Sequence, residues 1–122
     1  MAIATPTNIQ LHQQSRMLEI DFDDGKHFEL SCEYLRTHSP SAEVQGHGPG
    51  QEKLQVGKED VNITAIEPVG NYAVCLVFDD NHNSGIFSWD HLYELGRDKE
   101  ENWARYLKRL EEAGHHREPK DG

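Results

Sequence analysis

The stretch Leu18-Glu-Ile-Asp-Phe-Asp-Asp-Gly25 decides the fold, because a similar stretch returns later in the chain as Val74-Cys-Leu-Val-Phe-Asp-Asp-Asn81. In the first copy, apolar and acidic residues alternate from Leu18 to Phe22, which is the period of a half-buried strand. The Asp24-Gly25 pair predicts a two-residue hairpin turn, in which both positions need a positive φ. The second copy is more apolar, and Tyr72–Phe78 is expected to be the central strand.

Each copy is followed by a return strand and a short helix. After the first copy, Phe28 and Leu30 alternate with polar residues, and Glu33–Arg36 is expected to form one helical turn. After the second copy, residues 84–88 return the chain towards a second helix. Two such units could pair about a pseudo-twofold axis, or their likeness could be chance.

The second short helix is expected to cover Trp89–Leu95. Ser88 is a suitable N-cap, and Gly96 is expected to supply the C′ stop. Further strands are predicted at Asn8–His12 and Val61–Ala65, with a turn at residues 68–71.

The last helix is expected to start at Asp98, with Glu101 three residues on, as in a capping box. Gly114 ends it. Its apolar residues share one face at i, i+3, i+4 and i+7 spacing, which predicts core packing. They are Trp103, Tyr106, Leu107 and Leu110.

These elements predict an α+β fold. It consists of hairpin-rich antiparallel or mixed sheet units with short helices, and a C-terminal amphipathic helix packed on the sheet. We expect one domain at residues 7–113, a flexible N-terminus at 1–6 and a disordered tail at 114–122, since 122 residues suit one domain.

The composition argues against several classes of partner. The formal net charge is −10, which repels phosphate backbones and anionic membrane surfaces. No apolar run is long enough to span a membrane, and the N-terminus lacks a secretory signal. Cys32 and Cys75 form no recognisable disulfide or metal pattern, so buried thiols and a cytoplasmic location are expected.

The sequence carries no catalytic motif of the GxGxxG, P-loop, HExxH or GxSxG kind, so we expect a binding or accessory module and no enzyme. Residues 37–59 are too rich in serine, proline and glycine for a regular element, and long loops in compact domains are often functional. We therefore predict a protein-binding surface on the loop from His38 to Gln51. Its contact residues are expected to be Arg36, Ser39, Ser41, Glu43, Gln45, Gly46, His47 and Gly48.

A metal-binding protein is the alternative. The chain has eight histidines, and imidazole is the commonest metal ligand in proteins. His82 with His38 or His47 could hold a labile iron or zinc ion, and no permanent cofactor is expected. The histidine spacing matches no established ligand pattern, so solvated histidines also explain it.

Several segments carry a resemblance to a known family. Phe22-Asp-Asp-Gly25, Tyr34-Leu-Arg36 and the string from Ser39 to Gly48 resemble the gamma-butyrobetaine hydroxylase-like N-terminal domain family, in its small stand-alone bacterial form. The resemblance covers roughly residues 7–113. Further matching positions are Ile66–Tyr72, Phe78-Asp-Asp80, His82, Ser84-Gly-Ile86, Trp89 and Leu92.

In the hydroxylases this domain precedes an iron- and 2-oxoglutarate-dependent catalytic domain, and it binds zinc through three cysteines and a histidine. The cysteine positions correspond here to Ser39, Ser41 and Val44, and only the histidine, His82, is present. Hydroxyl and alkyl groups cannot replace thiolates on zinc. The resemblance therefore implies the scaffold without its zinc site and without hydroxylase activity.

A similar domain ends the iron–sulfur-carrying P-loop ATPases of chloroplasts. By this analogy we expect a protein partner in iron–sulfur cluster assembly, or an accessory role beside iron-dependent enzymes.

Overall fold

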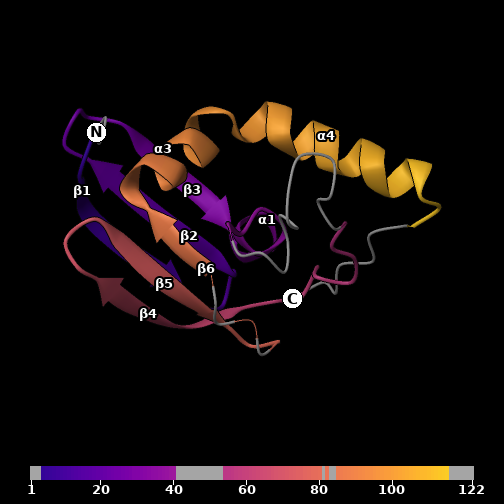
Figure 1. Cartoon of the computed structure of the whole chain (residues 1–122), viewed down its shortest axis with the longest axis horizontal. Helices are drawn as coiled ribbons and strands as arrows, with labels where there is room; N and C mark the ends of the chain where they lie inside the picture. Colours follow the sequence, from indigo (N-terminus) through magenta and orange to yellow (C-terminus); the bar gives the residue numbers. More distant parts are fainter. Residues whose placement is uncertain (1–3, 41–53, 81, 83–84, 116–122) are drawn as a thin grey trace.

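The computed structural model describes residues 4–40, 54–80, 82 and 85–115. Within these residues the chain forms two three-stranded antiparallel sheets with helices after each, which confirms the α+β class (Figure 1). The first sheet has the order β1-β2-β3 and the second β4-β5-β6.

Each sheet is a simple meander that leads into a helix. The first half consists of β1 (Pro6–His12), β2 (Met17–Phe22), β3 (His27–Ser31) and α1 (Cys32–Thr37). The second half consists of β4 (Ile63–Val69), β5 (Ala73–Phe78), β6 (Gly85–Ser88) and α3 (Trp89–Arg97), and α4 (Lys99–Glu112) ends the described chain.

The two halves repeat the same local chemistry. The hydroxyl of Ser31 accepts the N–H of Tyr34 at 3.0 Å, and the hydroxyl of Ser88 accepts the N–H of His91 at 3.1 Å. Each serine thus satisfies an N–H at the start of a helix that has no intrahelical partner. The leucine four residues after each cap points into the core. The predicted repeat of strand, turn, strand and helix is therefore present in the fold.

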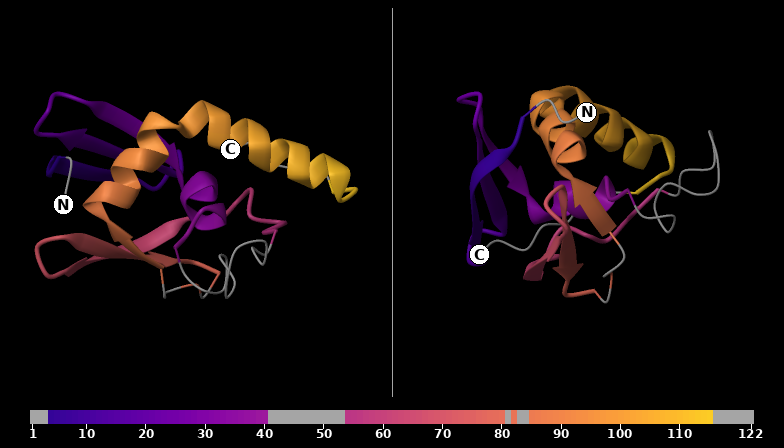
Figure 2. Two further views of the ribbon diagram at one scale, coloured as in Figure 1. Left: turned by 45° about the horizontal axis from the view of Figure 1, so that its top comes forward. Right: turned by 60° about the vertical axis from the view of Figure 1, so that its left-hand side comes forward.

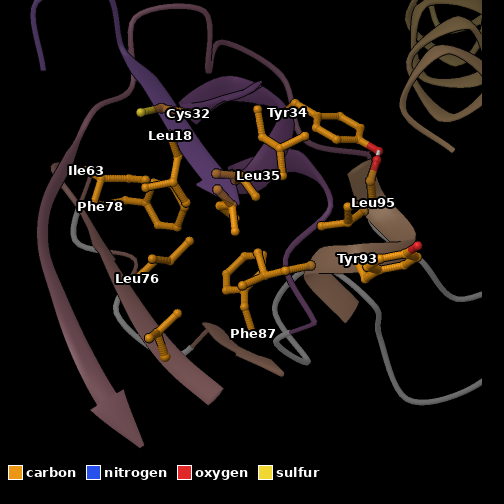
Figure 3. Close-up of a cluster of buried hydrophobic side chains, with 14 of the residues drawn as sticks. Leu18, Cys32, Tyr34, Leu35, Ile63, Leu76, Phe78, Phe87, Tyr93 and Leu95 are labelled. Atoms are coloured by element: carbon orange, nitrogen blue, oxygen red, sulfur yellow. Dashed lines mark hydrogen bonds between the residues drawn. The ribbon is translucent and has the colours of Figure 1, made fainter. Parts of the chain in front are cut away.

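Both halves share one hydrophobic core. Alternate residues of β2 and β5 face each other across the space between the sheets, and α3 lies between the two sheets (Figure 2). Figure 3 shows Leu18, Leu35, Leu76 and Phe87 pointing into this space, and each is fully buried. Burying one such side chain contributes about 1.5–3 kcal/mol, so the core is the main source of stability.

The predicted two-residue turn after β2 is wrong. Gly25 has a φ of +89°, but Asp24 does not have a positive φ. The Gly25 N–H donates to the Phe22 carbonyl at 3.1 Å, so the connection is a longer loop with one left-handed glycine. The Asp24 carboxylate accepts the Lys26 N–H at 3.0 Å and the Tyr93 hydroxyl at 2.6 Å, which holds the chain in this loop.

Two other boundaries also differ from expectation. β4 starts after Val61 and runs through Pro68, which was expected in a turn. β4 lies at the edge of its sheet, so the N–H that proline lacks is not needed for strand pairing there. The turn instead begins at Gly70, whose φ is +56°. β1 begins two residues earlier than expected, at Pro6, and Ala4 is buried in the core.

Gly96 does not stop α3 as predicted, because the helix continues to Arg97. A Cβ added to Gly96 would lie within 2.7 Å of three atoms of the Phe28 ring. Close packing against β3 therefore explains this glycine. The capping box predicted at Asp98 is also absent. The Asp98 carboxylate makes no cap hydrogen bond to α4 and accepts instead from Arg97 Nε and Nη2, at 3.1 and 3.0 Å.

The predicted apolar stripe of α4 is only partly in the core. Tyr106 and Leu110 are buried and Trp103 is half-buried, but Leu107 is 39% exposed. α4 passes beside the end of β3 and α1 (Figure 1). There the rings of Trp103 and Tyr34 meet edge to face. Half of the stripe therefore faces a groove at the surface.

Candidate functional site

A partly buried ionic cluster lies at the described ends of the predicted contact loop. Arg36 on α1 donates from Nε to Asp80 Oδ2 at 2.9 Å and from Nη1 to Gln55 Oε1 at 3.1 Å. Lys58 Nζ donates to the same Asp80 oxygen at 2.7 Å. Burial raises the pKa of Asp80, but the hydrogen bonds and charges of Lys58 and Arg36 outweigh it and hold this pKa below its ordinary value.

Beside this cluster, Ser39 and His82 are both buried and contact each other. The Ser39 hydroxyl lies 3.0 Å from His82 Nε2, and the His82 N–H donates to Asp80 Oδ1 at 3.2 Å. Gly85 closes the space, because a Cβ there would lie 2.5 Å from Ser39 Oγ. The cluster joins α1 to the turn between β5 and β6.

The family resemblance aligned Ser39 and His82 with two zinc ligands, and the fold does bring these positions together. The donors do not fit zinc, however. A neutral hydroxyl takes the place of a thiolate, and it already contacts the ring nitrogen that would have to bind the metal. The aligned positions 41 and 44 lie outside the described residues. The described residues of this site therefore do not fit a zinc ion.

The two described histidines of the predicted metal site, His38 and His82, each contact other residues of the chain. The His38 ring packs between Tyr34 and Tyr106, and its Nδ1 lies 3.0 Å from the Tyr34 carbonyl. Burial lowers the pKa of His38 below its ordinary value. Among the described residues, no three His, Cys, Asp or Glu side chains are placed to hold a metal ion. His47 lies outside those residues, so its part in a metal site stays a prediction.

The predicted contact loop is described only at its ends. Arg36 and Ser39 are buried and bond to other residues of the chain, and their part in a contact surface stays a prediction. The remaining predicted contact residues lie outside the described part of the chain. They are Ser41, Glu43, Gln45, Gly46, His47 and Gly48.

The thiols differ in depth but not in direction of shift. Burial raises the pKa of Cys32 to about 11, and burial also raises the pKa of the half-exposed Cys75. A thiol with a raised pKa carries little thiolate at neutral pH, and the thiolate is the nucleophile. Neither environment favours a reactive cysteine.

The sequence reasoning missed a groove between β3 and α4. It has a volume of about 390 Å³, and Met17 and Tyr34 line one side while Trp103, Ala104 and Leu107 line the other. Glu29, Lys99 and Glu100 also line it. The sequence signal for this groove is the apolar stripe of α4, of which the core buries only Tyr106 and Leu110. The groove combines apolar side chains with a few charged ones, as binding sites commonly do.

In the described part of the chain, no helix is long and apolar enough to cross a membrane.

Comparisons with known proteins identify a family and similar folds. The family described as "Gamma-butyrobetaine hydroxylase-like, N-terminal" matches residues 9–93. No protein with curated annotation matches the chain. A solution NMR structure of a protein 52% identical superposes with a TM-score of 0.82, covering 97% of this chain and 88% of the other. A second NMR structure, 47% identical, has a TM-score of 0.81 and covers 98% and 94%.

A crystal structure from Acidithiobacillus ferrooxidans is 38% identical, with a TM-score of 0.64, and covers 75% of this chain and 92% of the other. It is described as a protein of unknown function of the DUF971 family. The family match and the repeated fold confirm the predicted resemblance, and the chain belongs to the gamma-butyrobetaine hydroxylase-like N-terminal domain family.

Proposed function

We propose that this protein is a non-catalytic binding module that docks a partner protein in the groove between β3 and α4. One observation carries the proposal: the apolar face of α4 is only half used by the core. Leu107 is 39% exposed and Trp103 is half-buried, yet both line the groove beside Met17. Aromatic and aliphatic side chains around a recess are typical anchors of protein interfaces.

The polar interior supports the non-catalytic part of the proposal. Arg36 and Lys58 both pair with the Asp80 carboxylate and tie three segments together, which is a structural task. His82 contacts Ser39, and the Cys32 thiol is held protonated by burial. A general base or nucleophile needs an accessible group with a suitably tuned pKa.

The class of partner is proposed from the family resemblance. It points to the iron–sulfur assembly machinery or to iron-dependent enzymes, and we place the interaction in the cytoplasm. An adaptor needs an anchor surface and no reactive centre, so a binding groove is sufficient for this role.

Capture of partners from lysate of the native host, identified by mass spectrometry, tests the proposal. Ala104 lies exposed in the groove, so Ala104→Arg should block it without disturbing the core. Ala113→Arg is the matched control, since it places the same side chain at the exposed end of the same helix. Specific iron–sulfur or iron-enzyme partners should be captured by the wild type and by Ala113→Arg, and lost with Ala104→Arg. Equal capture by both variants would refute the groove as the binding surface.

A further inference from the structure

The groove has a strand edge as one of its walls. β3 lies at the edge of the first sheet, so one side of its backbone has no neighbouring strand within that sheet. The β2–β3 ladder is bracketed by bonds from Phe22 N–H to the Lys26 carbonyl, at 2.8 Å, and from Cys32 N–H to the Arg16 carbonyl, at 2.9 Å. Because antiparallel ladder bonds fall on every second residue, the backbone groups of Glu29 point away from β2.

The ammonium group of a lysine on α4 occupies this edge. Lys99 Nζ donates to the Glu29 carbonyl at 3.0 Å, which agrees with the direction of that carbonyl. Lysine is a flexible, strongly hydrated partner, so it can leave the carbonyl to another donor at little cost. The Glu29 carbonyl at this edge is therefore bonded only to a movable lysine side chain in the described residues. An incoming backbone N–H can displace that side chain.

The surroundings of the groove are acidic. Ser31 lines both the groove and a second hollow of about 320 Å³, which lies beyond it. The charged residues that line the two hollows comprise five carboxylates and two cations. They are Glu29, Glu33, Glu59, Asp60 and Glu100 against Arg16 and Lys99. Together the groove and the second hollow form an acidic trough. A positively charged segment is electrostatically complementary to this trough.

We propose that the groove binds an extended, basic segment of a partner protein, whose backbone pairs with the β3 edge at Glu29. Its alternate apolar side chains lie against Trp103 and Leu107, and its lysine or arginine side chains face the carboxylates of the trough. An extended segment fits because successive side chains of a strand point to opposite sides, one towards α4 and the next away from it. This inference rests on the proposed function and names the chemistry of the partner.

Selection of random dodecapeptides on phage against the full chain tests the inference. The enriched peptides should alternate apolar residues with lysine or arginine. A synthetic enriched peptide should bind Ala104→Arg at least tenfold more weakly than the wild type, and bind Ala113→Arg unchanged. The double variant Glu29→Gln with Glu100→Gln should weaken binding severalfold at low salt and less in 0.5 M NaCl, because salt screens exposed charges.

Other outcomes overturn the inference. Enrichment of acidic or uncharged peptides, helical apolar spacing in the enriched set, or no enrichment would each reject a basic extended segment. A wild-type dimer in sedimentation velocity that Ala104→Arg dissociates would show that a second copy occupies the groove. Tighter peptide binding after removal of residues 116–122 would show that the chain's own end occupies it. If lysate capture still depends on Ala104 while peptide selection fails, the binding module stands and only the named partner chemistry falls.

Discussion

Replacing Gly96 by alanine sets two effects of opposite sign against each other. In an ordinary helix interior this change stabilises by about 1 kcal/mol, because glycine is a poor helix former. Here the new Cβ would lie within 2.7 Å of Cγ, Cδ1 and Cδ2 of Phe28, whereas carbon atoms pack best at about 3.5–4.0 Å. These atoms are close to the Phe28 backbone, so a swing of the ring tip cannot relieve the overlap.

The expected balance is destabilisation. Overpacking costs about 1–3 kcal/mol. The Phe28 ring also makes edge-to-face contacts with Phe22 and Tyr93, at centroid distances of 5.8 and 5.6 Å, and losing one such pair costs about 0.5–1.5 kcal/mol. Subtracting the helix gain leaves a loss of about 2 kcal/mol. Each kcal/mol should lower the melting temperature by about 4 °C in a domain of this size.

A double-mutant cycle measured by urea unfolding checks this reasoning. In a Phe28→Ala background the obstructing atoms are gone, so Gly96→Ala should now stabilise by up to about 1 kcal/mol. Gly57→Ala is the control. Gly57 has a φ of +71° and open space around it, so alanine there should cost about 1–2 kcal/mol in both backgrounds. A stabilising Gly96→Ala in the wild-type chain, or the same loss in both backgrounds, would refute packing as the reason for this glycine.

Four further outcomes are expected. Asp80→Asn should destabilise by about 1–3 kcal/mol in urea unfolding, because it leaves two cations without their carboxylate; an unchanged midpoint would contradict the structural role of the cluster. Because the pKa of His38 is lowered in the folded state, the unfolded chain protonates this imidazole at a higher pH than the folded chain does, so the free energy of unfolding should fall as the pH drops below about 6.5. His38→Gln should reduce the slope of the free energy of unfolding against pH in this range, and an equal slope in both proteins would refute the contribution of His38. Changing Glu43, Gln45 and His47 together should abolish partner capture at an unchanged melting temperature if the loop contacts the partner, and retained capture or unfolding rejects that prediction. EDTA should leave the melting temperature unchanged, because the core and the ionic cluster hold the fold; melting by EDTA, or stoichiometric metal that survives dialysis, would favour the metal-binding alternative.

The sequence predicts the parts of the fold that depend on local periodicity. The strand at Leu18–Phe22 and the cap at Ser88 follow from alternation and hydroxyl chemistry, and both are present. The features that fail depend on distant neighbours. Gly96 has the sequence context of a helix stop, but its reason is Phe28 on another element. Pro68 signals a turn unless its strand is known to lie at an edge.

The candidate site was harder to predict for the same reason. Arg36 and Ser39 are polar residues next to a loop, which suggests exposure, and only the fold shows that Asp80 and His82 bury them. The apolar stripe of α4 was identified, but its periodicity cannot tell which part of the face the core leaves uncovered. Leu107 belongs to that uncovered part.

Hydrogen bonds between the two repeats have a consequence for how the chain folds. α1 belongs to the first repeat, yet the Tyr34 hydroxyl donates to the Leu95 carbonyl of the second at 2.6 Å (Figure 3). Arg36 of α1 likewise bonds to Asp80 of the second repeat. A polypeptide cut between the repeats should give two fragments that fold only when mixed.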